Sequence, residues 1–215
     1  QIFAKQVING RLQTIWTGSG TIISADGVIL TNAHVAAPTS PGLATLYNDP
    51  ELLFGEEPDQ LVVALSESAD RPPTEAYIAE LAAADGALDL AVIEITADLD
   101  GNELNPATLN LPFVEVGDSD TFTRGNVAGF ESQNRVGDRA WIKTDATISP
   151  GNSGGLGVNA AGQIIGVPSF GQEAIGGAIN RLRAINYAVP LLEAAAANSQ
   201  YDSPYVVEGT GQETF

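Results

Sequence analysis

The chain has no cysteine, no methionine and a single histidine among its 215 residues. The absence of cysteine excludes disulfide bonds, a thiol nucleophile and any cysteine-based metal site. Zinc sites draw mainly on several Cys and His side chains, so with one histidine we expect neither a metal nor another cofactor. Translated chains start with Met, so its absence predicts that this sequence is a processed or excised piece.

Basic side chains are scarce, because 9 Lys and Arg stand against 27 Asp and Glu and give a net charge of −18. A field of this sign repels nucleic acid and anionic membranes, which excludes nucleic-acid partners. A net negative charge of this size is typical of highly soluble proteins or of proteins in a salty or extracellular setting. The alternative explanation of the charge is that it attracts a basic substrate. No apolar run approaches the roughly 20 residues of a membrane span. The sequence contains no basic segment followed by an apolar one, so we expect no signal peptide within it.

Short β-branched runs separated by turns are abundant and predict an all-β protein. Two such runs flank Asp26-Gly27 and predict a β-hairpin over residues 17–31. Further strands are expected at residues 61–65, 89–95, 127–130, 140–143, 163–167 and 185–189.

Turn-forming residues divide the chain between these strands. Residues 36–60 are rich in Pro, Gly, Asn and acids and predict a long surface excursion. Residues 98–112 contain Asp, Gly, Asn and two prolines, and we expect a linker between two domains there. Pro190–Ala197 is the best helix candidate, because its proline falls in the first turn.

The sharpest local motif is Gly151-Asn152-Ser153-Gly154-Gly155. Glycines around a serine permit a tight turn that exposes the hydroxyl beside free backbone N–H groups. Such N–H groups stabilise an oxyanion by about 3–4 kcal/mol each. The simpler alternative is that the segment is only a glycine-rich turn.

Chain order discriminates among the enzymes that use such a serine. The motif fits the G-x-S-x-G elbow of α/β-hydrolases, but that fold needs a histidine after the serine, and His34 lies far before it. The subtilisin order needs an aspartate before the histidine, where only Asp26 stands, in the expected hairpin turn. The order His, Asp, Ser remains, which is that of chymotrypsin. His34 is the only imidazole that can activate the serine.

Five segments, in the right order, resemble bacterial trypsin-like proteases of the HtrA/Deg type. Gly18–Val35, which reads Gly-Ser-Gly-Thr-Ile-Ile-Ser-Ala-Asp-Gly-Val-Ile-Leu-Thr-Asn-Ala-His-Val, is similar to their histidine region. Asp89–Ile95 is similar to their aspartate strand, and Thr144–Gly155 closely resembles their serine loop. Gly117–Asp120 and Asn186–Pro190 also look like segments of that family.

The resemblance implies a fold of two six-stranded antiparallel β-barrels with a short C-terminal helix. Residues 1–105 would form the N-terminal barrel, which carries the histidine and the aspartate. Residues 106–190 would form the C-terminal barrel, which carries the serine, and residues 191–215 the helix and tail.

The same resemblance implies a catalytic triad of His34, Asp89 and Ser153. Ser153 would attack the peptide carbonyl, His34 would accept and return its proton, and Asp89 would orient His34. Gly151, Asn152 and Ser153 would form the oxyanion hole. The implied activity is that of a serine endopeptidase, which cleaves polypeptides through an acyl-enzyme in the periplasm or outside the cell.

The substrate pocket is expected at five residues: Thr147, Ile148, Gly166, Val167 and Pro168. In the family, the residue six before the serine lies at the base of the primary pocket, and here it is Thr147. Because no aspartate stands there, cleavage after Lys or Arg is not expected. We predict a small or medium apolar side chain in the pocket, with the substrate backbone added as an extra strand.

The sequence departs from the family in three places. Asn152 replaces the aspartate that pairs with a freed N-terminus in the digestive enzymes, so no zymogen cleavage of that type is expected. Asp120 runs directly into Thr121 where the family places another strand, and our hypothesis is that residues are missing between them. No PDZ-like module follows Pro190, so the chain is the protease domain of a larger protein or a stand-alone enzyme.

Two other functions fit the same residues. A protease-fold binding or scaffold module without turnover would keep the fold and lose catalysis, which an intact triad argues against. An esterase or acyltransferase would use the same triad, and cleavage of a plain peptide amide would distinguish a protease from it.

Overall fold

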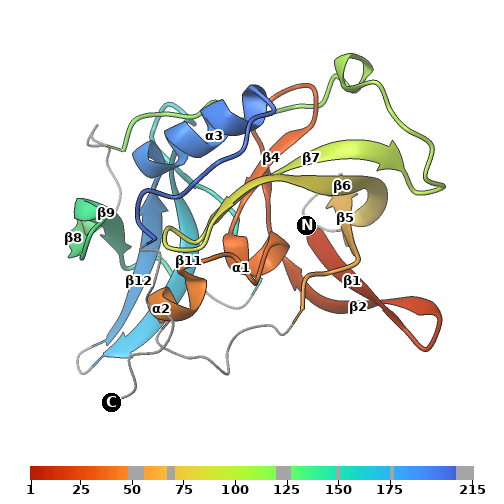
Figure 1. Cartoon of the computed structure of the whole chain (residues 1–215). Helices are drawn as coiled ribbons and strands as arrows, with labels where there is room; N and C mark the ends of the chain where they lie inside the picture. The colour runs from red at the N-terminus through yellow and green to blue at the C-terminus, as the bar shows by residue number, and fades with distance from the viewer. Residues whose placement is uncertain (48–55, 67–70, 120–126, 149–150, 175–176, 207–215) are drawn as a thin grey trace.

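The computed structural model describes residues 1–47, 56–66, 71–119, 127–148, 151–174 and 177–206. Two antiparallel sheets dominate this part of the chain (Figure 1). The first sheet has the order β2-β1-β5-β6-β7-β4-β3 and the second the order β10-β11-β12-β9-β8. The predicted all-β class with a short C-terminal helix is confirmed, with seven and five strands in the described residues rather than six and six.

Several of the strands coincide with β-branched runs of the sequence. The first sheet contains β1 (Ile2–Ile8), β2 (Arg11–Gly18), β3 (Thr21–Ile22), β4 (Val28–Thr31), β5 (Gln60–Leu65), β6 (Thr74–Asp85) and β7 (Leu90–Asp98). The second sheet contains β8 (Val127–Gln133), β9 (Gly137–Thr144), β10 (Gly157–Val158), β11 (Ile164–Ala174) and β12 (Gly177–Ala184).

Short helices occupy the connections between strands. They are α1 (Ala33–Ala36), α2 (Leu43–Tyr47), η1 (Pro106–Thr108), η2 (Ile185–Ala188) and α3 (Val189–Ala196). The C-terminal helix α3 lies where it was predicted, with proline in its first turn. The segment 185–189, which was predicted to be a strand, forms η2 and the start of α3 instead. In the described part of the chain, no helix is long and apolar enough to cross a membrane.

One apolar cluster joins the two sheets to the C-terminal helix. Leu30 and Val92 of the first sheet pack in it with Val167 of the second sheet and Leu191 of α3. Each such side chain, fully buried, contributes about 1.5–3 kcal/mol to folding. The cluster therefore fixes the two sheets relative to each other, and Figure 1 shows α3 lying across them.

A buried arginine adds a polar connection between the sheets. Arg183 of β12 is fully buried, and its Nε donates to the backbone oxygen of Leu88, 2.7 Å away. Its other nitrogens donate to the Ala140 carbonyl (3.2 Å) and to Oε1 of Gln133 (2.6 Å). The guanidinium also lies 3.5 Å from the centre of the Trp141 ring. Burial lowers the pKa of Arg183 to about 9, so the group stays cationic at neutral pH.

The expected linker is packed against the molecule rather than free. Leu111 belongs to the apolar core of the first sheet, and its backbone N–H donates to the Ala25 carbonyl. Val116 forms a parallel bridge with Ile164 next to the second sheet. The domain bounds at residues 105 and 190 stay a prediction. The hypothesis of residues missing between Asp120 and Thr121 concerns a junction outside the described residues.

The serine-containing turn docks against the first sheet through close backbone contacts. The backbone N–H of Ser19 donates to the Ser153 carbonyl (2.7 Å), and its hydroxyl donates to the Gly151 carbonyl (2.6 Å). Thr31 Oγ1 in turn donates to the Ser19 carbonyl (2.7 Å). Gly154 has φ +81°, and a Cβ there would collide with the Ser19 carbonyl oxygen and Thr31 Oγ1. Glycine is therefore required at this position for space as well as for backbone conformation.

Substituting this glycine tests the docking of the turn. We expect Gly154→Ala to lower the free energy of unfolding, measured by urea denaturation, by about 3 kcal/mol or more, because backbone strain and overpacking add together. Gly162→Ala is the matched control: Gly162 has φ +80°, but a Cβ there meets open space. This control is expected to lose only about 1–2 kcal/mol from strain. Equal losses in the two variants would contradict the close docking.

Candidate active site

The carboxylate of Asp89 lies at the start of β7 in a constrained backbone position. Asp89 has φ +56°, in the left-handed region, which Asp tolerates better than most residues. Its neighbours Leu88 and Leu90 are fully buried and anchor the chain on either side. The Asp89 side chain is itself 0% exposed. The local fold thus holds a carboxylate at a fixed point inside the protein.

His34 faces this carboxylate from α1. Its Nδ1 lies 3.0 Å from Asp89 Oδ1 and 2.9 Å from Oδ2. The backbone N–H of His34 also donates to Oδ1, at 3.0 Å. With Nδ1 protonated toward Asp89, the lone pair of Nε2 is available to accept a proton. The imidazole is 13% exposed, so it lies at the edge of solvent.

Asp89 tunes the charge of His34. Burial alone would lower the pKa of His34, but the negative charge of Asp89 and the hydrogen bond to it outweigh burial. The pKa of His34 is therefore raised above its ordinary value. A raised pKa makes the imidazole a stronger base, which suits proton abstraction from a hydroxyl.

Tyr47 of α2 is a third member of this group. It lies within residues 36–60, where the sequence predicts a surface excursion. Its hydroxyl donates to Asp89 Oδ2 at 2.6 Å and lies 3.1 Å from His34 Nδ1. The apolar spacing of Leu43, Leu46 and Tyr47 is typical of a helix face and could have indicated α2. No feature of the sequence indicated the contact with Asp89.

Hydrogen bonds through Asn32 and Ser169 connect this pair to the expected nucleophile, Ser153. The side-chain amide of Asn32 donates to the Asp89 carbonyl (2.7 Å) and to the Ser169 hydroxyl (2.9 Å). Ser153 Oγ donates to the Ser169 carbonyl at 3.4 Å, which is long for a hydroxyl hydrogen bond. Ser153, Asp89 and His34 are thus linked through two intervening residues, although 119 positions separate His34 from Ser153 along the chain (153 − 34).

The three residues of the expected oxyanion hole form one tight turn. Gly151 has φ +96°, and the Asn152 carbonyl accepts the backbone N–H of Gly155 at 2.9 Å. The Gly151 and Ser153 carbonyls are both bound by Ser19. With these carbonyls held from one side, the turn has a fixed backbone conformation.

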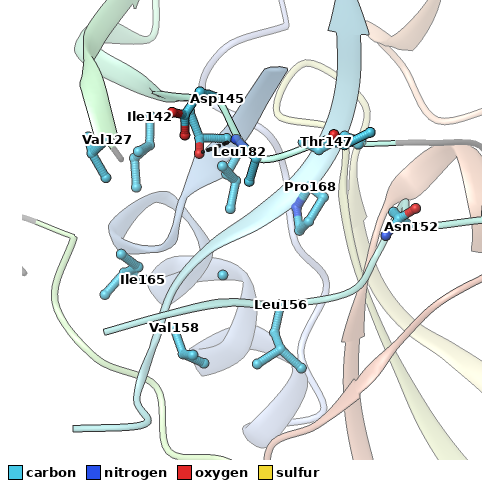
Figure 2. A pocket seen from close by; sticks show the side chains of 14 residues that line it. Val127, Ile142, Asp145, Thr147, Asn152, Leu156, Val158, Ile165, Pro168 and Leu182 are labelled. Atoms are coloured by element: carbon cyan, nitrogen blue, oxygen red, sulfur yellow. Dashed lines mark hydrogen bonds between the residues drawn. The ribbon is translucent and has the colours of Figure 1, made fainter. Parts of the chain in front are cut away.

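A cavity of about 600 Å³ opens beside the serine turn (Figure 2). Thr147, Asn152 and Pro168 lie on one side of it, and Figure 2 shows Asp145 near Ile142 and Leu182 on the other. Asp145 is the only charged residue among its described lining. The lining residues are Val127, Ile142, Thr144, Asp145, Ala146, Thr147, Ile148, Asn152, Leu156, Gly157, Val158, Ile165, Pro168 and Leu182.

Three of the five expected pocket residues line this cavity, namely Thr147, Ile148 and Pro168. Val167 does not, because it is 1% exposed and packs in the core between the sheets. Gly166 is not among the lining residues either, and a Cβ at this position would lie 2.9 Å from Leu182 Cβ, so Gly166 faces Leu182. In the pairing of β10 with β11, Gly157 lies opposite Gly166 and Val158 opposite Ile164, so the register shifts at Ile165, which lines the cavity. The sequence of β11 alone does not indicate this irregularity.

Within the described residues, no group of three His, Cys, Asp or Glu side chains is arranged to hold a metal ion. The site contains a carboxylate–imidazole pair and, connected to it by hydrogen bonds, a serine in a glycine-rich turn, and these are the residue types used for nucleophilic acyl transfer.

The sequence profile of a family described as trypsin-like peptidase domain matches residues 18–167. The serine endoprotease DegS of Haemophilus influenzae is 31% identical over 195 residues, which cover 85% of this chain and 49% of that protein. A probable periplasmic serine endoprotease, DegP-like, of Halomonas elongata is 31% identical over 194 residues, covering 81% of this chain and 32% of that protein. The chain thus spans half or less of the length of these relatives.

A solved structure described as HtrA-type protease AlgW with decapeptide is also similar. It shares 30% sequence identity and a TM-score of 0.57, covering 88% of this chain and 54% of that one. The matched region of the family profile contains His34, Asp89 and Ser153. This chain therefore belongs to the trypsin-like peptidase family, as a serine protease domain of the HtrA type.

Proposed function

We propose that this domain is a serine endopeptidase that hydrolyses polypeptides with a triad of His34, Asp89 and Ser153. One observation carries the proposal: the single imidazole of the chain lies 2.9–3.0 Å from a buried carboxylate. Hydrogen bonds through Asn32 and Ser169 connect Ser153 to the same group of residues. The relatives named as serine endoproteases support the same activity.

The geometry supports an acyl-enzyme mechanism. Ser153 Oγ attacks the substrate carbonyl carbon while its proton passes to Nε2 of His34. Asp89 keeps the Nδ1–H of His34 oriented and stabilises the imidazolium that forms. His34 then gives the proton to the leaving amine, and the C–N bond breaks. Water attacks the acyl-enzyme by the reverse sequence, with His34 again as base, and releases the acid and the free serine.

The turn around the serine supplies the oxyanion hole in this proposal. The backbone N–H groups of Gly151 and Ser153 donate to the oxyanion, and Asn152 sets the turn between them. The hydrogen bonds from Ser19 to the carbonyls of this turn support a fixed orientation of its backbone. Donors that are already oriented stabilise a transition state without reorganisation at the moment of reaction.

The cavity of about 600 Å³ receives the side chain before the scissile bond. Its lining is mostly apolar, and Thr147 rather than an acid stands near the serine turn, so we propose small or medium apolar residues at this position. The Gly154 N–H of the serine turn donates to the Pro168 carbonyl at 3.1 Å, so β11 lies next to this turn. We propose that the substrate backbone adds to β11 as an extra strand.

The expected location is extracytoplasmic. Relatives of this chain carry the word periplasmic in their names, and the net charge of −18 is typical of proteins exposed to salt. The expected partners are polypeptide substrates, which follow from the proposed activity. Nucleic acid is not expected, because an acidic surface repels it.

A binding or scaffold module without turnover is the alternative. The Ser153 hydroxyl donates to the Ser169 carbonyl at 3.4 Å, which is a long contact. Catalytic hydrogen bonds in unliganded enzymes are often long and tighten when substrate binds, so this contact agrees with either state.

Reaction with a fluorophosphonate distinguishes an activated serine from an inert one. We expect the intact mass of the protein to rise by a single adduct, because His34 activates Ser153 and the turn stabilises the oxyanion. The Ser153→Ala variant is the control and is expected to take up none. An unreacted wild type would move the binding-module alternative to the front.

A library of plain peptide amides then separates a protease from an esterase and reads the pocket in the same assay. We expect cleavage after residues such as Ala, Val and Leu, and none after Lys or Arg. Turnover of activated esters without amide cleavage would show an esterase instead, and cleavage after basic residues would refute the proposed pocket.

The pH profile of kcat/KM tests the role of His34. The base works only when neutral, and its pKa is raised above the ordinary value of about 6.5. We therefore expect kcat/KM to increase with pH through a midpoint above about 6.5 and to be lost in acid. A profile that stays flat from pH 5 to 8 would contradict a histidine base.

A further inference from the structure

The hydroxyl of Tyr47 completes the set of donors around the Asp89 carboxylate. We propose that Tyr47 is a positioning residue, which fixes the rotation of Asp89 and so the orientation and basicity of His34. This inference rests on the proposed function, because it assigns a role within the same triad. Tyr47 reaches the pair from α2, a segment outside the motifs that resemble the HtrA family.

The hydrogen bonds at Asp89 divide between its two oxygens. Oδ1 accepts the backbone N–H of His34 at 3.0 Å, and Nδ1 of His34 faces both oxygens. Oδ2 accepts the Tyr47 hydroxyl at 2.6 Å, the shortest of these contacts. Tyr47 thus adds a second donor at Oδ2, where Nδ1 of His34 is the other one. This added contact resists rotation of the carboxylate about its Cβ–Cγ bond and so keeps one edge toward the imidazole.

The tyrosine ring also meets the imidazole directly. The two rings pack edge to face, with centroids 5.9 Å apart and planes 84° apart. Because the Tyr47 O–H points to Asp89, its oxygen lone pairs face Nδ1 of His34 at 3.1 Å. This contact favours the tautomer with a proton on Nδ1, which leaves Nε2 free to act as the base.

The hydroxyl of Tyr47 remains a donor throughout the working pH range. Burial is the main cause that raises the pKa of Tyr47, and the negative charge of Asp89 and the hydrogen bond to it raise it further. A phenol that does not ionise near neutral pH always supplies its proton to the carboxylate. The donation disperses the charge of Asp89, which reduces the pull of that charge on the imidazolium.

The backbone around α2 is packed against the loop that carries Asp89. Gly42, just before α2, has φ +91°, and a Cβ there would lie 2.9 Å from the backbone nitrogen of Ala87. A Cβ on Gly86 would lie 2.5 Å from the Pro41 carbonyl oxygen. Leu43, the first residue of α2, is 1% exposed. The two segments therefore meet backbone to backbone, which places Tyr47 and Asp89 on one packed unit.

Other charged groups surround the pair from neighbouring elements. From the second sheet, the Arg183 cation interacts electrostatically with Asp89 and with Asp85 at the end of β6. The phenol of Tyr187 also neighbours this guanidinium. All of these groups remain in place when the single oxygen of Tyr47 is removed, so the Tyr47→Phe variant isolates the hydroxyl.

The experiment compares Tyr47→Phe with the wild type by kinetics and by NMR of ¹⁵N-labelled imidazole. The chain has one histidine, so every imidazole signal belongs to His34. We expect kcat to fall about tenfold with KM within about twofold, because orientation is lost at the chemical step. We expect the titration midpoint of His34 to rise by about half a pH unit, since the charge of Asp89 is less dispersed.

Tyr201→Phe is the matched control. Its hydroxyl donates to Asp85 Oδ2 at 2.8 Å, so this variant also loses one hydrogen bond from a phenol to a carboxylate. We expect a comparable loss of stability in the two variants, with kcat and the His34 midpoint unchanged only in Tyr201→Phe.

The outcomes separate this inference from the proposed function. If Tyr47→Phe keeps the wild-type kcat and His34 midpoint while losing stability, Tyr47 is only structural and the inference is overturned. If the wild type cleaves no peptide but Tyr47→Phe still shifts the imidazole titration, the positioning of His34 is supported and the proposed turnover fails.

Discussion

A buried carboxylate without partners is costly, and the Asp89 side chain is fully buried. The surrounding structure offsets this cost with the imidazole and backbone N–H of His34 and with the hydroxyl of Tyr47. The Arg183 cation adds a favourable charge from the second sheet and binds the carbonyl directly before Asp89. Elements that are distant in sequence thus meet at one negative charge, and the same contacts that stabilise it orient the base.

The class of the fold was predictable because its signals are local. Alternating β-branched runs and an Asp-Gly turn specify strands and a hairpin through neighbouring residues alone. The packing of Leu111 was not predictable, because a segment with turn-forming residues carries no sign that it lies against a core. For the same reason, α2 sits inside a stretch whose composition predicts a surface loop.

The candidate site was predictable to the extent that motifs carry it. The single histidine and the glycine-rich serine turn pointed to His34 and Ser153, the family resemblance added Asp89, and the roles of all three stay predictions. The lining of the cavity was less predictable, because the pairing irregularity at Ile165 depends on contacts between strands that the sequence of one strand does not encode. Tyr47 was missed because its contact with Asp89 joins residues 42 positions apart through the docking of a loop.

The most direct test of this account is to replace Asp89 with asparagine, which keeps the shape and tolerates the left-handed backbone at φ +56° but removes the charge. With the fold verified by urea denaturation, the account predicts that kcat/KM falls by about 10⁴-fold. It also predicts that the titration midpoint of the single histidine moves to lower pH, because burial is no longer outweighed by a negative charge. Activity within a few fold of the wild type, with an unchanged histidine midpoint, would contradict the central role of Asp89.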